Sequence, residues 1–175
     1  MIQVVHTADV DPATLHAARA MLEAVFEGDF EDADWEHSLG GMHALAWDGD
    51  ELVGHASLIQ RRLLHGGRAL RAGYVEGVGV RADRQRQGYG GAMMDALERI
   101  IRAAYDLGAL GATDDGARLY LARGWQRWRG PTSAITPDGV VRTAEEDAFI
   151  YVLPGAAELD LSGELACDWR DGDVW

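Results

Sequence analysis

The most informative segment of the chain is Val78-Gly79-Val80-Arg81-Ala82-Asp83-Arg84-Gln85-Arg86-Gln87-Gly88-Tyr89-Gly90-Gly91. It leads from the end of an apolar strand, through a loop rich in glycine and arginine, into an amphipathic helix. Successive backbone N–H groups and the helix dipole then point at one spot, which favours the binding of a pyrophosphate. Gly88 and Gly90 allow the backbone to approach such a ligand closely. An ordinary glycine-rich turn between a strand and a helix is the alternative, because loop composition alone does not distinguish the two.

A dinucleotide-binding fingerprint overlaps this stretch. Gly77-Val78-Gly79-Val80-Arg81-Ala82 matches the pattern GxGxxG/A. In a Rossmann fold, an acidic residue about 20 positions further on ends a second parallel strand. Here that position is Glu98, which lies inside a helical pattern, and the strands before Gly77 are joined by hairpin turns. The sequence therefore argues against a Rossmann site.

Three strands precede the loop, over Met42–Trp47, Leu52–Leu64 and Leu70–Val80. The first two are joined by the tight-turn sequence Asp48-Gly49-Asp50, and the last two by Gly66-Gly67. Connections this short join antiparallel neighbours, so the sequence predicts an antiparallel meander.

The other predicted elements follow from apolar periodicity and from turn residues. At the N-terminus we expect a strand over Ile2–Val5, a helix beginning at Asp11-Pro12, and a loop with a short helix around Asp29–Glu36. The loop Arg81–Gly90, called the decisive loop below, is followed by an expected helix to Ala104 and a buried strand over Leu107–Ala112. A second helix is expected from Asp114 or Asp115 to Arg123. Strands around Trp125–Ile135 and Phe149–Leu153 follow, with a turn at Pro137–Gly139 between them, and the tail Gly155–Trp175 is only weakly periodic. No linker or repeat interrupts this pattern, so residues 1–175 are predicted to form a single α+β domain.

Charge and composition exclude several classes of protein. The 29 acidic residues outnumber 16 basic ones, giving a net charge of −13. Every basic residue is arginine, so a lysine Schiff base and a P-loop lysine are impossible. The acids cluster in Glu27–Glu36, Glu145–Asp147 and Asp168–Asp173. Such a surface serves solubility, repels nucleic acid and attracts cationic ligands.

Other absences are informative at the level of sequence. No apolar run approaches the ~20 residues of a membrane span, and the N-terminus resembles no secretory signal. Cys167 is the single cysteine, so an internal disulfide is excluded. The six histidines show no HxxxH or HxH spacing, so no metal site is predicted. We expect a cytoplasmic protein that binds neither membrane nor nucleic acid.

Two motifs together resemble the GNAT acyltransferases. Gln85–Gly90 fits the signature Q/R-x-x-G-x-G/A, placed between a strand and a long helix as in that family, and Leu119-Tyr120-Leu121-Ala122-Arg123-Gly124-Trp125 is similar to its "LY…GF" element. The resemblance implies an α+β fold with a mixed, mostly antiparallel, centrally splayed sheet flanked by helices, and acetyl-CoA as co-substrate. It assigns the pantetheine arm to the backbone of Val78, Gly79 and Val80, and the pyrophosphate to Gln85, Arg86, Gln87, Gly88, Tyr89 and Gly90.

One branch of that family resembles the whole chain, namely the aminoglycoside 2′-N-acetyltransferases. The similar segments are Gly28–Phe30, Asp34–His37, Leu39–His43, Gly73–Val78 and the tryptophan-terminated tail Cys167–Trp175. Carried over by position, the residues that hold the aminoglycoside are the side chains of Asp29, Asp34, Glu76 and Asp173, the terminal carboxylate of Trp175 and the backbone of Gly77. Glu146 stands where the family has aspartate, and Gly111 where a relative can offer serine. The acid clusters agree independently, because an aminoglycoside is a polycation.

The resemblance implies acetyl transfer to the 2′-amino group within a ternary complex, and hence aminoglycoside resistance. Glu76 is the candidate general base with the Trp175 carboxylate as partner, and Tyr120 is the candidate acid. The Val78 N–H is the candidate donor to the oxyanion. A GNAT enzyme acting on another amine (a polyamine, an amino sugar or a peptide N-terminus) and a non-enzymatic drug-binding protein are the alternatives. By analogy with the family, a homodimer is expected.

Overall fold

The computed structural model of the chain describes residues 1–112 and 114–175. The chain forms two compact units. Unit 1 comprises Met1–Ile59 and Val75–Arg99, and unit 2 comprises Gln60–Tyr74 and Ile100–Trp175. The two longest strands and the longest helix each contribute residues to both units.

Unit 1 contains an antiparallel ladder. β1 (Ile2–His6) pairs with β2 (Met42–Asp48), and β2 pairs with the beginning of β3 (Glu51–His65). The end of β4 (Arg68–Val80) also lies in this unit. Its helices are α1 (Pro12–Val25), α2 (Asp32–His37) and the first part of α3 (Tyr89–Ala104), with 3-10 turns at Thr7–Asp9 and Ala82–Arg84.

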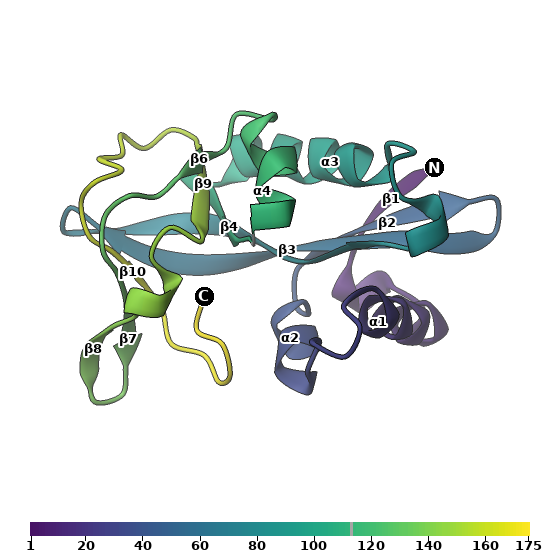
Figure 1. Ribbon diagram of the computed structural model, residues 1–175, viewed down its shortest axis with the longest axis horizontal. Coiled ribbons are helices and arrows are strands. Elements are labelled where there is room, and N and C mark those ends of the chain that lie inside the picture. Colours follow the sequence, from purple (N-terminus) through teal and green to yellow (C-terminus); the bar gives the residue numbers. More distant parts are fainter. Residues whose placement is uncertain (113) are drawn as a thin grey trace. The chain divides into compact units, whose positions relative to one another are not determined.

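Helices cover both faces of the strands in unit 1, with α1 on one face and α3 on the other (Figure 1). Two glycines allow this close packing. A Cβ at Gly79 would lie 2.6 Å from Leu22 of α1, and one at Gly54 would lie 3.1 Å from Met93 of α3. Leu22 and Met93 are fully buried. The glycine at position 79 is therefore explained by packing against α1.

Unit 2 is built around a sheet with the strand order β6-β9-β5-β4-β3-β10-β7-β8. Its further strands are β5 (Leu107–Gly111), β6 (Gln126–Arg127), β7 (Thr132–Thr136), β8 (Gly139–Arg142), β9 (Ile150–Pro154) and β10 (Leu165–Cys167). The β4–β5 and β7–β10 pairs are parallel, and the β5–β9, β6–β9, β3–β10 and β7–β8 pairs are antiparallel. The sheet is thus mixed and mostly antiparallel. α4 (Asp114–Leu121) and a 3-10 turn at Ala144–Glu146 complete the unit.

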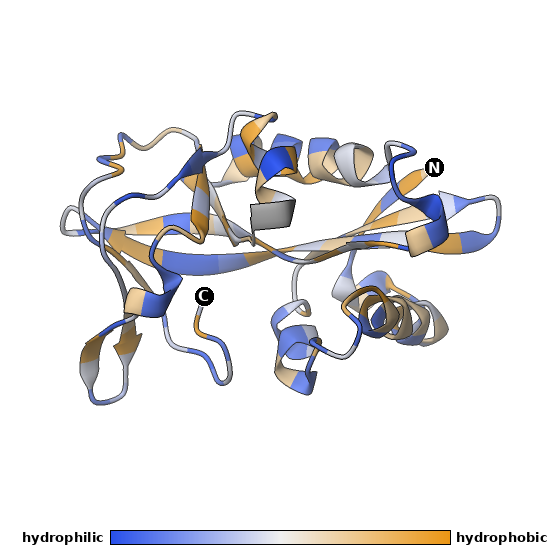
Figure 2. Cartoon of the chain, viewed as in Figure 1, coloured by the Kyte–Doolittle hydropathy of each residue, from blue (hydrophilic) through white to orange (hydrophobic). Residues whose placement is uncertain are grey.

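The tail packs into the core of unit 2. Trp175, the last residue, belongs to the same buried cluster as Tyr74, Trp128 and Cys167. Figure 2 colours the loop between β10 and the C-terminus mostly as hydrophilic, whereas the strands around the core alternate in hydropathy. The chain end is therefore anchored by an apolar residue behind a polar loop.

The structure confirms most of the predicted elements, including the meander strands, the helix after the decisive loop and the short helix in the acidic segment. The predicted strand Trp125–Ile135 is instead two strands, β6 and β7. Between them, the N–H groups of Arg129 and Gly130 both donate to the carbonyl oxygen of Leu161 in the tail. The ladder is interrupted because the tail takes these donors.

Two strands were not predicted. The Pro137–Gly139 turn connects β7 to β8 as a hairpin, and every residue of β8 is exposed, so no alternation of hydropathy marks it. β10 is only three residues long, which is too short for a periodic signal in the tail.

Candidate active site

The decisive loop in unit 1 has the backbone geometry of an anion-binding turn. Arg86 (φ 59°) and Gly88 (φ 89°) lie in the left-handed region, and α3 begins directly afterwards at Tyr89. A Cβ at Gly88 would meet no atom within 4 Å. The N–H groups of the first helical turn have no partner within the helix, so they are available to an anion. These features fit a pyrophosphate.

The side chains of the loop mostly shape the loop itself. Gln85 Nε2 donates to Val80 O at 3.3 Å, and Gln87 Nε2 donates to Asp83 O at 3.2 Å. Both glutamines were predicted to bind the pyrophosphate, and here their amides bond to the backbone.

Acids neutralise most of the positive charge that the loop concentrates. Arg81 bonds Asp83 (2.6 Å) and Glu51 (3.1 Å), and Arg84 bonds Asp83 (2.8 Å). Arg86 is exposed and forms no ion pair with any side chain that the structure describes. Because Arg81 and Arg84 are already paired with acids, Arg86 is the arginine of the decisive loop best able to bind a phosphate.

The predicted base, Glu76, lies next to a kink in β4. Its side chain is half-buried, and Gly77 beside it has φ 54°. Side chains of β3 hold both carbonyls: Ser57 Oγ donates to Glu76 O at 3.3 Å, and His55 Nδ1 donates to Gly77 O at 2.8 Å. Gly77 is required on steric grounds as well, because a Cβ there would lie 2.8 Å from Ser38 Oγ.

Two predicted substrate carboxylates flank or begin α2 in unit 1. Asp29 is exposed. Asp34 is half-buried, and its Oδ2 accepts the Glu31 N–H at 2.8 Å as part of a capping box at the start of α2. The cap fixes the orientation of the Asp34 carboxylate and occupies one oxygen.

Unit 2 holds the remaining predicted carboxylates, and its polar bonds fix the tail. Asp173 Oδ1 accepts the Trp175 N–H at 3.0 Å, and the Trp175 indole Nε1–H donates to Thr143 Oγ1 at 2.9 Å. Arg170 donates to Asp173 O at 2.8 Å and to an oxygen of the terminal carboxylate of Trp175 at 2.6 Å. Trp175 is 4% exposed. The main-chain oxygen of Trp175 is thus held in place by Arg170.

An arginine that sequence analysis did not single out also anchors the tail. Arg61 of β3 is only 4% exposed, and it bonds the Asp168 carboxylate at 2.8 Å and the Val174 carbonyl at 2.7 Å. The Arg61 and Arg170 guanidinium groups lie 4.7 and 5.5 Å from the centre of the Tyr74 ring. Cation–π contacts of this kind stabilise by about 0.5–2 kcal/mol each. The cluster supports the loop that carries Asp173.

Glu146 and Asp173 interact electrostatically within unit 2. Burial and then the nearby charges of Asp173 and Glu145 raise the pKa of Glu146 above its usual value. Accumulated negative charge of this kind is relieved when a cation binds. Glu146 and Asp173, predicted as substrate ligands from distant parts of the sequence, are thus brought together.

The predicted acid, Tyr120, lies at the end of α4 and is 7% exposed. Its ring packs edge-on against Trp125, with 5.9 Å between ring centres. Burial raises the pKa of Tyr120 to about 12, so the phenol keeps its proton at neutral pH. Cys167 is buried, and burial raises the pKa of its thiol to about 11, which is unsuitable for a nucleophile.

Gly111 ends β5 and is exposed. A Cβ there would lie 3.8 Å from the Tyr74 hydroxyl oxygen, an ordinary contact, so a larger residue fits at this position.

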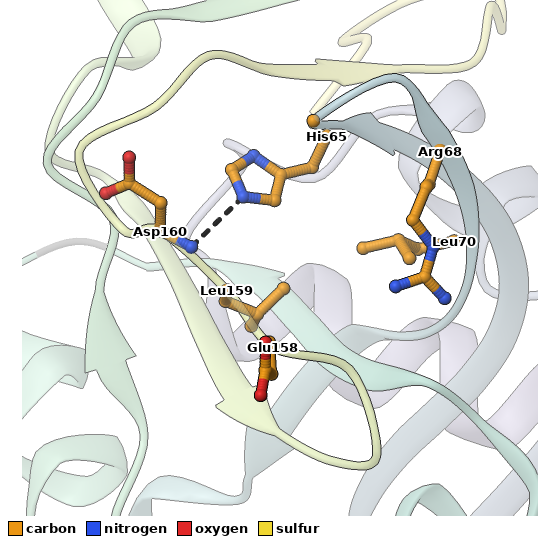
Figure 3. A pocket seen from close by; sticks show the side chains of 7 residues that line it. His65, Arg68, Leu70, Glu158, Leu159 and Asp160 are labelled. Atoms are coloured by element: carbon orange, nitrogen blue, oxygen red, sulfur yellow. Dashed lines mark hydrogen bonds between the residues drawn. The ribbon is translucent and has the colours of Figure 1, made fainter.

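A separate cavity of about 370 Å³ in unit 2 contains none of the predicted site residues (Figure 3). Arg68, Glu158 and His65 contribute to its lining. Both ring nitrogens of His65 already form hydrogen bonds within the fold: Nδ1 donates to Glu164 O at 2.9 Å, and Nε2 accepts the Asp160 N–H at 3.1 Å. Among the described residues, no group of three or more histidine, cysteine or carboxylate side chains is arranged to hold a metal. Likewise, no described helix has the length and apolarity to cross a membrane.

Comparisons with known proteins identify relatives of the chain in sequence and in fold. An aminoglycoside 2′-N-acetyltransferase of Mycolicibacterium fortuitum is 53% identical over 99% of this chain and 91% of its own length. Among solved structures, Escherichia coli ElaA has a TM-score of 0.60 at 21% identity, covering 87% of this chain and 98% of its own. Mycobacterium abscessus Eis1 has a TM-score of 0.63 at 20% identity over 76% of this chain, which spans only 33% of Eis1. These structures support the fold alone. A sequence profile described as "Acetyltransferase (GNAT) domain" matches residues 7–127. The chain belongs to the GNAT family of acetyltransferases.

Proposed function

We propose that the protein transfers the acetyl group of acetyl-CoA to the 2′-amino group of aminoglycosides, and that it thereby confers resistance to them. The observation that carries this proposal is the 53% identity, over 99% of the chain, to a protein named aminoglycoside 2′-N-acetyltransferase. By analogy with the family the protein would be a homodimer, and the composition of the chain favours the cytoplasm.

In this proposal, separate groups of residues bind the cofactor, bind the aminoglycoside and transfer protons. Acetyl-CoA supplies an activated acyl group, and Gln85–Gly90 with the α3 N-terminus holds its pyrophosphate. The carboxylates of Asp29, Asp34, Glu76, Glu146, Asp173 and the chain terminus, with the Gly77 backbone, bind the cationic sugar. An ammonium group cannot attack a thioester, so Glu76, directly or through water, accepts a proton from the amine. Tyr120 supplies the proton that the leaving thiolate requires.

Thiol release from acetyl-CoA across a panel of aminoglycosides tests the proposal. We expect turnover with compounds that carry a 2′-amino group and little with those that carry a 2′-hydroxyl, with the product acetylated at the 2′ nitrogen by NMR. Acetyl transfer to another nitrogen, or only to polyamines or peptides, would replace the aminoglycoside assignment. Tight aminoglycoside binding without thiol release would favour a drug-binding protein.

Gly88→Val is expected to weaken coenzyme A binding at least tenfold. A β-branched side chain is strained at φ 89° and obstructs the approach of the ligand to the backbone, and each lost charge-assisted hydrogen bond costs about 1.5–3 kcal/mol. Calorimetry with coenzyme A measures the affinity. Gly66→Val is the matched control, because Gly66 also has positive φ and open space around it but lies in the β3–β4 turn. Equal coenzyme A affinity in both folded variants would exclude this role of the loop.

Glu146 is expected to make aminoglycoside binding sensitive to pH on the acid side. Its pKa is raised in the free protein, whereas a bound polycation favours the ionised carboxylate and lowers that pKa again. Binding therefore releases a proton as pH falls into the raised range, and affinity declines there. Calorimetry in buffers of different ionisation enthalpy counts these protons. Glu146→Gln should bind more weakly at neutral pH and release fewer protons; an unchanged proton count would place Glu146 outside the substrate site.

A further inference from the structure

A chain of buried hydrogen bonds in unit 1 ends at the peptide between Gly77 and Val78. His43 of β2 and His55 of β3 are both fully buried, and His43 Nδ1 lies 2.9 Å from His55 Nε2. At one end, His43 Nε2 lies 2.8 Å from Thr7 Oγ1. At the other end, His55 Nδ1 lies 2.8 Å from Gly77 O. None of these side chains is used in the proposed function.

The protonation of the two rings follows from the Gly77 end of the chain. Gly77 O can only accept, so His55 Nδ1 carries a proton. Burial lowers the pKa of both His43 and His55 to about 4, so each neutral ring has one N–H. His55 Nε2 therefore accepts from His43 Nδ1–H, and His43 Nε2 is left as an acceptor 2.8 Å from the Thr7 hydroxyl, whose single proton also has Gly41 O as an acceptor at 3.1 Å. Thr7 Oγ1 in turn accepts the Gly40 N–H at 2.9 Å. The N–H donors of both rings therefore point towards Gly77.

The geometry of the peptide transfers this constraint to the next N–H. The described chain has no cis peptide bond, and in a planar trans peptide the C=O and N–H groups point in opposite directions. The Gly77 carbonyl, bonded to His55, therefore directs the Val78 N–H away from His55. Because hydrogen bonds in a chain polarise one another, the bonded carbonyl also makes this N–H a better donor.

We propose that the Thr7–His43–His55 chain positions the Val78 N–H to donate to the thioester carbonyl oxygen of acetyl-CoA. The inference rests on the proposed function, in which negative charge develops on that oxygen and the Val78 N–H stabilises it. His43 and His55 are positioning residues: they act through the Gly77–Val78 peptide and do not touch the substrate.

The first test measures the ring protonation of the ligand-free protein. Nitrogen NMR of histidine-labelled protein at about pH 7 should show His43 and His55 both protonated at Nδ1 and unprotonated at Nε2. A charged ring, or an Nε2–H tautomer in either residue, would overturn the proposed chain. This arm needs no variant and no turnover.

The second test separates the hydrogen bond from packing by three substitutions of His55. In Asn, the side-chain amide nitrogen takes the place of Nδ1, so His55→Asn keeps the donor to Gly77 O. In Gln, the amide lies one atom further out, near Nε2, so His55→Gln contacts His43 but not Gly77 O. His55→Leu removes both bonds. His65→Leu is the matched control, because it removes a histidine whose two nitrogens are also bonded.

The readout independent of turnover is the Val78 amide signal in ¹H–¹⁵N spectra. In the parent protein, His55→Asn and His65→Leu, it should shift with acetyl-CoA but not with coenzyme A, which lacks the thioester carbonyl. In His55→Gln and His55→Leu that difference should vanish. Removal of an oxyanion donor costs roughly 10²–10³-fold in kcat, so we expect at least a tenfold lower kcat in these two variants, with the KM values little changed.

The outcomes distinguish this inference from the proposed function. Absence of acetyl transfer by the parent would overturn the proposed function, while the Val78 response and the tautomers would still decide the inference. A His55→Leu variant that keeps the parental Val78 response, or a parent that shows none, would overturn the inference. So would equal loss of kcat in His55→Asn and His55→Leu, which would indicate packing alone.

Discussion

Tyr120→Phe is expected to lower kcat by roughly 10²–10⁴-fold, the usual contribution of a general acid, with little change in aminoglycoside affinity. The substitution removes one hydroxyl and keeps the ring, so the edge-on contact with Trp125 is retained. Because burial raises the pKa of Tyr120 to about 12, the phenol is protonated throughout the neutral range. The tyrosine itself should therefore cause no decline in rate between about pH 7 and pH 9.

Tyr151→Phe is the matched control for this prediction. Tyr151 is fully buried in the same unit, and its hydroxyl oxygen accepts from Arg127 at 2.8 Å. Loss of that hydroxyl should reduce stability and leave kcat nearly parental. Stopped-flow measurement of thiol release, with the melting temperature of each variant, separates the two effects. A Tyr120→Phe enzyme within about twofold of the parent would show that Tyr120 is a packing residue.

The decisive loop was predictable because its signal is local. A strand, a turn with glycines and an apolar helical face follow one another within Val78–Leu97, and each depends only on nearby residues. What could not be predicted there is how the side chains are used. Arg81 and Arg84 add positive charge to the loop, but they form ion pairs with Glu51 and Asp48 at the turn of the β2–β3 hairpin, which the local sequence does not reveal.

The histidine chain depends on strand register, which sequence spacing within one strand does not give. His43 pairs with Ser57 and Leu45 pairs with His55, so the two histidines are diagonal neighbours across the β2–β3 hairpin. A search for metal-like spacings, which considers one segment at a time, cannot find such a pair. The sequence did contain a usable signal: once the β2–β3 hairpin is aligned, His43 and His55 lie two positions apart on facing strands.

The surroundings of the predicted carboxylates likewise depend on contacts between distant parts of the chain, which local sequence does not reveal. Resemblance placed Glu146 and Asp173 in one site, and the structure shows their electrostatic interaction. Arg61 was not anticipated, because it lies in the last third of a long strand, 107 residues before its partner Asp168. A buried arginine has no local sequence signature; its role depends on where the tail docks.

The free carboxylate of Trp175 is expected to be required for aminoglycoside affinity. Converting it to a carboxamide by ligation of a synthetic tail removes one charge and leaves the indole bond to Thr143 and the Asp173 bond to the Trp175 N–H intact. A charge-assisted hydrogen bond contributes about 1.5–3 kcal/mol, so we expect KM for the aminoglycoside to rise roughly tenfold to a hundredfold. Coenzyme A affinity should be unchanged, because its proposed loop lies in unit 1.

Appending a few residues after Trp175 should have an equal or larger effect, since the extension also displaces the oxygen held by Arg170. The same residues added before Met1 are the control, because that terminus lies in unit 1, where its ammonium group donates to Trp47 O. Higher salt should narrow the difference between the free acid and the carboxamide, because it screens exposed charge pairs. If the carboxamide protein keeps the parental KM and kcat, the terminus serves only to close the core of unit 2, and the aminoglycoside is held by the side-chain carboxylates alone.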